Sequence, residues 1–310
     1  MRFKYAPSSG PIQLAKSIAA LNSNVVILSE TGDEMTNTLR AAMSAQYDTW
    51  SSVNDADNGI LSRFPIIESS RGNSYVKAVI DTGYSKVAVY SAHLDWHYYA
   101  PYLPRGYGGG ALSGVTSEYG WNKIPTGPIT DTKIIGAVNR NSDRYSEMNA
   151  IINDAKTESQ KGREIIIGGD FNEPNGLDWT ASTGSKFQHN NVIYDFDMHK
   201  LLRDSGYIDT YRSLHPDPIT HPGITWPGEL NGIPAGDVTE VGADVRDRID
   251  FVYFKPSQQL TLNSAKIVGS KYSTKGSQTV PDNTDDDMIS PSGVWYSDHR
   301  GEFVTFRIDG

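Results

Sequence analysis

The chain has 310 residues, with 37 acidic against 28 basic side chains and a formal net charge of -9 at pH 7. This length allows a complete hydrophobic core, in one large domain or two small ones, and the absence of cysteine excludes disulfides and thiolate metal sites. The acid excess disfavours strong sequence-independent binding to nucleic acid, leaves a local basic groove open, and suits a site that binds divalent cations through carboxylates.

The first third of the chain predicts two helices and three strands. Apolar residues near helical spacing predict a helix at residues 11–22, and a second helix is expected at 34–45. A short buried strand at 25–28 lies between them. Strands are expected at 75–80 and 86–91, joined by an Asp-Thr-Gly-Tyr loop that suits a hairpin.

The remainder of the chain continues this mixture without regular alternation and without an internal repeat. The expected elements are helices at 142–156 and 198–202 and strands at 164–167, 249–254, 260–267 and 302–307. Such a mixture predicts an α/β sandwich of largely mixed sheets. Two stretches, 98–141 and 270–292, show little periodicity and are expected to be long loops.

The apolar run Ile165-Ile166-Ile167 is followed by two glycines and then by Asp170 and Asn172. An acid and an amide two residues apart project in the same direction from an extended chain. Taken alone, they are most simply an Asx-type turn that closes the strand.

The same kind of chemistry follows four other apolar runs. Glu30 follows the strand at 25–28, His93 follows 86–91, Asp250 opens 249–254, and Asp298 and His299 follow an apolar run at 294–296 that is expected to be a strand. Oxygen donors suit a hard cation such as Mg²⁺, Mn²⁺ or Ca²⁺, and imidazoles beside them suit phosphate binding or proton transfer. The combination predicts metal-assisted attack of water on a phosphate ester.

Six short segments within residues 25–306 form a recognisable series. They are Leu28-Ser29-Glu30, residues 59–66, Ser91-Ala92-His93-Leu94-Asp95, Gly168-Gly169-Asp170-Phe171-Asn172, Arg248-Ile249-Asp250-Phe251-Val252 and Ser297-Asp298-His299. In sequence and in order, they resemble the endonuclease/exonuclease/phosphatase superfamily, which has the DNase I-like fold. The resemblance implies a four-layer α/β/β/α sandwich of two mixed β-sheets. It also implies a single domain at 1–310, with a Gly- and aromatic-rich insertion at about 98–141.

The resemblance implies metal and water roles for four of these residues. Glu30 would be the main metal ligand, and Asp298 would be a second ligand or a partner of it. Asp170 would orient or deprotonate the attacking water. Asn172 would hold a phosphate oxygen or the nucleophile. The metal would be Mg²⁺ or Mn²⁺, or Ca²⁺.

Two histidines and one acid complete the implied site. His299 would contact the scissile phosphate and stabilise its developing charge. Asp250 would hydrogen-bond His299, fix its orientation and raise its pKa. His93 matches the family's other phosphate-facing histidine. These roles agree with the physical demand of displacement at phosphorus, which is positioning and charge neutralisation.

The start of the chain departs from the family pattern. Family members usually open with a strand carrying an Asn that contributes to the metal site, but no Asn precedes Asn22 here. The first strand is therefore expected to be altered or partly missing, with either a weaker metal site or another group that completes it.

Several neighbouring residues are candidates for substrate binding. Arg63 either anchors a loop or contacts substrate. His97, with Asp95, either adds a phosphate contact or a second metal site, or is an ordinary loop residue. Trp226 flanks the pocket or packs in the core, and the insertion at 98–141 is a lid or substrate wall or a purely structural excursion.

The favoured function is a divalent-metal-dependent phosphoesterase acting on a small-molecule, lipid or sugar phosphate ester, either a phosphodiester or a phosphomonoester. A metal-dependent endonuclease or exonuclease on DNA or RNA is the first alternative, which the acid excess and the lack of a basic run disfavour. The second alternative is a binding protein of the same fold with weakened catalysis.

No apolar run is long enough for a membrane span, and the first residues carry no apolar signal core. The many Asn, Ser, Thr, Gly and Tyr residues favour a secreted or periplasmic protein. Nothing in the sequence indicates the oligomeric state.

Overall fold

The computed structural model describes residues 10–46, 50–110, 122–230 and 242–309, and its centre is a mixed six-stranded sheet. The strands lie in the order β4 (Ile66–Arg71), β5 (Tyr75–Asp81), β6 (Lys86–His93), β7 (Glu164–Asp170), β9 (Asp250–Phe254) and β8 (Ile208–Asp209). β6 and β7 are parallel, and the other pairs are antiparallel. The predicted strands of this sheet are therefore confirmed.

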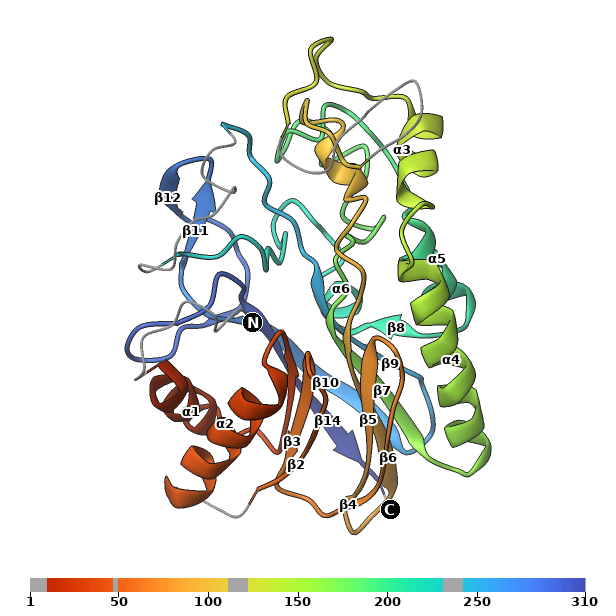
Figure 1. Ribbon diagram of the computed structural model, residues 1–310, viewed down its shortest axis with the longest axis vertical. Coiled ribbons are helices and arrows are strands. Elements are labelled where there is room, and N and C mark those ends of the chain that lie inside the picture. Colours follow the sequence, from red (N-terminus) through yellow and green to blue (C-terminus); the bar gives the residue numbers. More distant parts are fainter. Residues whose placement is uncertain (1–9, 47–49, 111–121, 231–241, 310) are drawn as a thin grey trace.

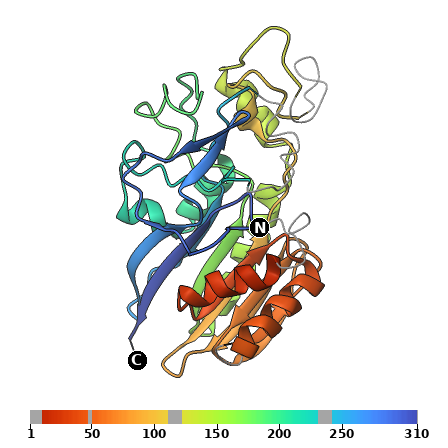
Figure 2. The same cartoon turned by 90° about the vertical axis from the view of Figure 1, so that its left-hand side faces the viewer.

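Two three-stranded sheets form a second layer against one face of the six-stranded sheet (Figure 2). Their orders are β1 (Val25–Ser29), β3 (Asn58–Ser62), β2 (Ser51–Asn54) and β13 (Met288–Ile289), β10 (Leu260–Val268), β14 (Gly301–Ile308). Ile60, Val76 and Val89 are buried in the core between the layers. Alternation along β6 sends Val89 to this core and Tyr90 to the opposite face.

Helices cover the two outer faces (Figure 1). α1 (Gly10–Ala20) and α2 (Gly32–Gln46) pack on the β1–β3 sheet, and α4 (Arg144–Gln160) and α5 (Asp197–Asp204) pack on the outer face of the six-stranded sheet. Leu14 and Leu39 are in the first contact, and Met148 in the second. The predicted α/β/β/α sandwich is confirmed.

Among the described residues, the second layer consists of two separate three-stranded sheets, whereas one sheet per layer was expected. β1 and β14 are both edge strands, and residues of both line a mainly apolar cavity of about 360 Å³ between the layers. Asp250 and His299 also line this cavity. Residues 1–9, where an altered first strand was expected, lie outside the described residues.

The two stretches predicted as loops contain regular structure. The insertion holds the short 3₁₀-helix η1 (Ala100–Tyr102) and α3 (Thr132–Asn139), and the later stretch holds a hairpin of β11 (Tyr272–Lys275) and β12 (Gln278–Pro281). The last described helix is α6 (Thr210–Leu214). Residues 111–121 of the insertion lie outside the described residues, so the lid hypothesis stays a prediction.

Three of the described tyrosines of the insertion are buried, which favours the structural interpretation for them. Tyr99, Tyr102 and Tyr107 form a small core with Val245 and Ile249. Within the described part of the chain, no helix combines the length and the apolar character needed to cross a membrane.

Candidate active site

Three neighbouring strands of the six-stranded sheet carry polar residues at the same register. In the parallel pair β6–β7, His93 lies opposite Asp170. In the antiparallel pair β7–β9, Asp170 lies opposite Asp250. Residues opposite one another on paired strands are about 5 Å apart. The structure therefore brings these three side chains together where β6 and β7 end and β9 begins.

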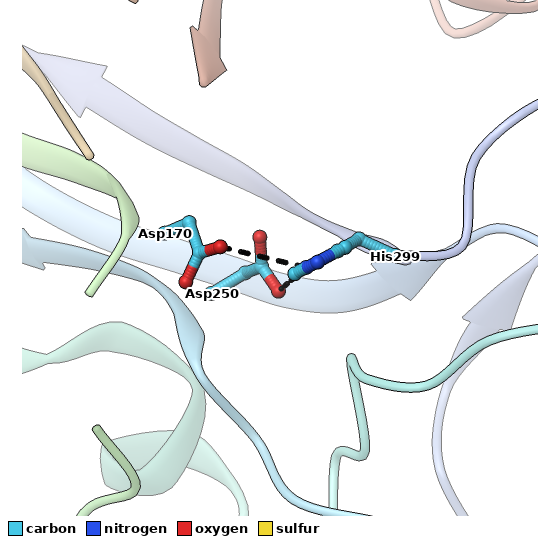
Figure 3. A group of neighbouring side chains, drawn as sticks. All are labelled: Asp170, Asp250 and His299. Carbon is cyan, nitrogen blue, oxygen red and sulfur yellow. Dashed lines mark hydrogen bonds and ion pairs between the residues drawn. The ribbon is translucent and has the colours of Figure 1, made fainter. Parts of the chain in front are cut away.

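His299 joins Asp170 and Asp250 in a compact group (Figure 3). Its Nδ1 lies 2.9 Å from Oδ2 of Asp250 and 3.8 Å from Oδ2 of Asp170. One ligand atom from each of the three residues lies within 4.8 Å of the others. An ionised carboxylate can only accept, so His299 donates from Nδ1 to Asp250, and its Nε2 is left for another partner.

The surroundings shift the pKa values of this group in a way that suits acid–base chemistry. Burial and the charge of Asp250 raise the pKa of Asp170 to about 6, although His299 and His93 oppose the shift. Burial lowers the pKa of His299, but the charges of Asp250 and Asp170 outweigh it and raise that pKa to about 9. Between these values, a carboxylate able to accept a proton lies beside an imidazolium.

A loop, and not a strand, positions His299. Residues 294–296 precede it without strand structure, so the predicted strand there is wrong. Trp295 donates from its indole to the His299 carbonyl at 2.7 Å, and Ser297 Oγ accepts from the His299 N–H at 3.0 Å. The loop is further held by Gly228, whose N–H donates to the Asp298 carbonyl at 2.6 Å.

His93 is oriented by Asp57, a residue that the sequence analysis missed. The Nδ1 of His93 lies 2.5 Å from Oδ2 of Asp57, and its Nε2 lies 3.8 Å from Oε1 of Glu30 and 3.9 Å from Oδ2 of Asp170. Burial lowers the pKa of His93, but these acids outweigh it and the pKa is raised. Asp57 lies two residues before the family-like segment at 59–66. It belongs to a turn, where acidic residues are common for structural reasons, so its sequence position gave no functional signal.

Glu30 reaches the site because Ser29 ties the two layers together. Ser29 Oγ donates to the Ala92 carbonyl and accepts from the Asp170 N–H, both at 3.1 Å. Glu30 itself has a φ of 58°, a left-handed conformation that a residue with a Cβ adopts only when its surroundings hold it there.

The donor set fits a hard divalent cation. Carboxylates of Glu30, Asp170 and Asp250 come from three different strands or strand ends, and oxygen donors are those that Mg²⁺, Mn²⁺ and Ca²⁺ prefer. Asp298 is buried, and its Oδ1 has no hydrogen-bond partner among the described residues. A buried carboxylate oxygen without a donor is costly unless a cation compensates it.

Asn172 is part of the framework that carries Asp170. Its N–H donates to Oδ1 of Asp170, and its Nδ2 donates to the Leu94 carbonyl, both at 2.9 Å. Since an amide nitrogen has two protons, one remains for another partner. The expected contact of Asn172 with a phosphate oxygen or the nucleophile stays a prediction.

Arg63 lies away from this group, which favours the first of its two expected roles, the loop anchor, over a contact with substrate. Its Nη1 donates to Oδ1 of Asn22 at 2.9 Å, and its N–H donates to the Asn24 carbonyl. Asn24 precedes β1, whereas Glu30 follows that strand. Arg63 therefore anchors the loop at the opposite end of β1.

The other two candidates for substrate binding lie nearer. The Trp226 ring is 6.3 Å from the His299 ring and 6.4 Å from the Tyr99 ring, so it contacts both the site and the insertion's core. His97 pairs with Asp95, Nδ1 to Oδ1 at 2.6 Å, on the loop that follows β6. Their contact with substrate stays a prediction.

Two comparisons of sequence place the chain among known proteins. Residues 6–299 match the profile of the Endonuclease/Exonuclease/phosphatase family. An uncharacterized protein of Caenorhabditis elegans is 28% identical over 271 residues, covering 83% of this chain and 78% of that protein. Because the profile matches nearly the whole chain, the chain belongs to the Endonuclease/Exonuclease/phosphatase family.

Solved structures share the fold at low identity. D. rerio TDP2, complexed with single strand DNA product, has a TM-score of 0.54 with 14% identity, covering 97% of this chain and 92% of that one. A functionally unknown conserved protein from Enterococcus faecalis has a TM-score of 0.53 with 12% identity, covering 99% and 94%. These similarities establish the DNase I-like fold.

Proposed function

We propose that this member of the family is a phosphoric ester hydrolase that cleaves phosphodiesters with the help of a divalent cation. The observation that carries the proposal is the group of Asp170, Asp250 and His299, in which a pKa of about 6 for Asp170 and of about 9 for His299 separates a base from an acid. Pairs of titratable groups with separated pKa values mark acid–base assignments in active sites.

The residues of the group have distinct roles in the proposed reaction. The Asp170 carboxylate orients the attacking water and takes its proton as the oxygen bonds to phosphorus. The imidazolium of His299 donates from Nε2 to a phosphoryl oxygen as negative charge grows there. Asp250 holds Nδ1 of His299, which fixes the ring and keeps it charged. The bond from phosphorus to the ester oxygen breaks, the leaving oxygen takes up a proton from solvent water, and Asp170 returns its proton to solvent.

Glu30 and Asp298 are proposed to hold the cation, together with an oxygen of the Asp170–Asp250 pair. When bound, Mg²⁺ or Mn²⁺ supplies neutralisation of the charge on the phosphoryl group. His93 and Asn172 lie on the β6 side of the site. Each binds a phosphate oxygen by donating a hydrogen bond from a side-chain N–H.

A nuclease is the second candidate function. TDP2, which shares the fold, was solved with a single strand DNA product, so a nucleic acid is a reasonable substrate class. The net charge of -9 argues for a short contact rather than a long backbone groove. A small, lipid or sugar phosphate ester stays a proposal beside it.

The test compares four substrates in Mg²⁺, in Mn²⁺ and in EDTA: plasmid DNA, a bis-aryl phosphodiester, an aryl phosphomonoester and sphingomyelin. We expect metal-dependent hydrolysis of a diester that Asp170→Asn reduces at least about a hundredfold. Inactivity on all four substrates, or equal activity of the variant, would contradict the proposal.

A further inference from the structure

The loop that follows β6 exposes a large aromatic side chain. Trp96 leaves 59% of its surface exposed to solvent, although tryptophan side chains are highly buried on average. Its ring stacks on that of His97, with centroids 3.9 Å apart and planes inclined by 25°. The two rings form one aromatic stack, which we name the 96–97 platform.

The platform is close to the candidate active site. Trp96 is three residues beyond His93, so their Cα atoms are at most about 11 Å apart. Between them, the Leu94 N–H donates to the Asp170 carbonyl at 3.1 Å, and the Leu94 carbonyl accepts from Asn172. The loop therefore leaves the sheet tied to the segment that carries the proposed base.

Hydrogen bonds hold the loop rigid under the platform. Oδ1 of Asp95 accepts from both the N–H and the ring Nδ1 of His97, and Oδ2 accepts from the Asp143 N–H. The Asp95 N–H in turn donates to Oε2 of Glu147 at 2.8 Å. Through Asp95, the His97 ring is thus fixed to the start of α4.

A buried arginine fixes the backbone of the same loop. Arg144, 1% exposed, donates to the carbonyls of Asp95, His97 and Tyr98 at 2.7 to 2.9 Å. Its Nε lies 3.4 Å from Oε2 of Glu173, the residue that follows Asn172. One guanidinium therefore joins the platform loop to the loop of the proposed catalytic segment.

This organisation suits ligand binding better than packing. An indole that is mostly exposed gains little for folding from being held in place, whereas a rigid aromatic surface binds a planar ring at a low cost in entropy. A nucleobase stacked on an aromatic side chain contributes about 1–3 kcal/mol. Such a contact needs no long basic groove, which agrees with the net charge of -9.

We infer that the 96–97 platform binds the nucleobase next to the scissile phosphate, and that the substrate is a nucleoside phosphodiester. This inference rests on the proposed function, because it assumes that the group around Asp170 binds the phosphate. It assigns Trp96 as a substrate-binding residue that sets specificity for a base on one side of the cleaved bond.

The test measures binding apart from turnover. Tetrathymidylate and the same oligomer with every base replaced by an abasic tetrahydrofuran residue are titrated into the full chain in EDTA by calorimetry. We expect wild type to prefer the base-containing oligomer. Trp96→Ala should weaken its affinity by about five- to 150-fold, and Trp96→Phe should retain most of it. The abasic oligomer should be unaffected by either variant.

Tyr84→Ala is the matched control, because Tyr84 is a 74% exposed aromatic in the turn at the other end of β6. Equal affinity of wild type for the two oligomers, or an equal loss in Trp96→Ala for both, would overturn the inference. A preference for bases that depends on Trp96, in a protein that hydrolyses no phosphate ester, would overturn the proposed hydrolysis and leave Trp96 as a nucleobase-binding residue only. Hydrolysis of diesters without that preference would overturn the platform alone.

Discussion

Asp170 and Asp209 are both buried aspartates of the six-stranded sheet, 2% and 4% exposed, and their surroundings treat them in opposite ways. Burial and Asp250 raise the pKa of Asp170 to about 6. Burial also acts to raise the pKa of Asp209, but the charge and hydrogen bonds of Arg248 outweigh it and lower that pKa to about 2. Two aspartates that are about equally buried therefore differ in pKa, which is raised at Asp170 and lowered at Asp209.

The difference lies in the partners. Arg248 donates to both carboxylate oxygens of Asp209 at 2.9 and 2.7 Å, and the same arginine pairs with Asp178. Asp170 faces another acid, Asp250, whose charge opposes its ionisation, and two histidines that favour it. A buried acid that an arginine satisfies stabilises the fold, whereas one held near titratable groups is available for proton transfer.

The largest effect is expected from Asp209→Asn. The variant leaves the buried guanidinium of Arg248 without its bidentate partner, which costs about 3–5 kcal/mol. The free energy of unfolding, measured by urea denaturation, should fall by that amount, while the activity per folded molecule is retained. A loss of activity with unchanged stability would show that Asp209 belongs to the catalytic group.

Asp170→Asn is expected to have the reverse outcome. Removing a buried charge that is repelled by Asp250 should leave the stability unchanged or increase it. The rate of phosphodiester hydrolysis should fall at least about a hundredfold, since the base is lost. Urea denaturation and steady-state kinetics on the same sample separate the two effects, and a large loss of stability would place Asp170 with Asp209.

The elements with strong hydrophobic periodicity could be predicted from the sequence. Elements whose residues show no such periodicity, because their burial depends on distant parts of the chain, could not. β4 is an edge strand with five of its six residues exposed, as its burial pattern shows, so its polar residues carry no alternation. α3 lies in a segment rich in Gly and Pro, where only Ile134, Ile135 and Val138 indicate a helix. Local patterns cannot show that such segments find partners far along the chain.

The site residues were predictable where an acid or histidine follows a buried strand. His93, Asp170 and Asp250 share a register across β6, β7 and β9, and strand ends are visible in the apolar runs. Asp57 was not predictable, because it contacts His93 only after the β2–β3 turn is brought across from the second layer. Arg63 matched a family segment, yet the antiparallel pairing of β1 and β3 carries it away from Glu30.

Two histidines extend the comparison to pH. Burial lowers the pKa of His199 to about 3, whereas the pKa of His299 is raised to about 9. Neutral His199 contributes stability that is complete above the unfolded value of about 6.5 and is lost as the pH falls toward 3, at up to about 1.4 kcal/mol per pH unit. His299 contributes stability below about 6.5 that is lost as the pH rises through 9.

His199→Gln should therefore flatten the fall in the free energy of unfolding between pH 6.5 and pH 4.5, in the protein without metal. His299→Gln should leave that acid limb unchanged and flatten the alkaline limb. Urea denaturation at half-unit pH intervals measures both limbs. If His199→Gln keeps the acid slope of wild type, the buried neutral state of His199 is wrong.

The smallest effect is expected from Asp57→Asn, which separates positioning from catalysis within the site. The Asp57 side chain is 48% exposed, so its pairing with His93 is partly screened by water. We expect kcat/KM to fall about tenfold, as for the loss of one orienting hydrogen bond. Because Asp57 raises the pKa of His93, the alkaline limit of the pH–rate profile should also move to lower pH.

The control is Asp81→Asn, which changes an acid at the far end of β5. It should change neither kcat/KM nor the alkaline limit. A tenfold loss without the pH shift would mean that Asp57 orders the β2–β3 turn and does not act through His93.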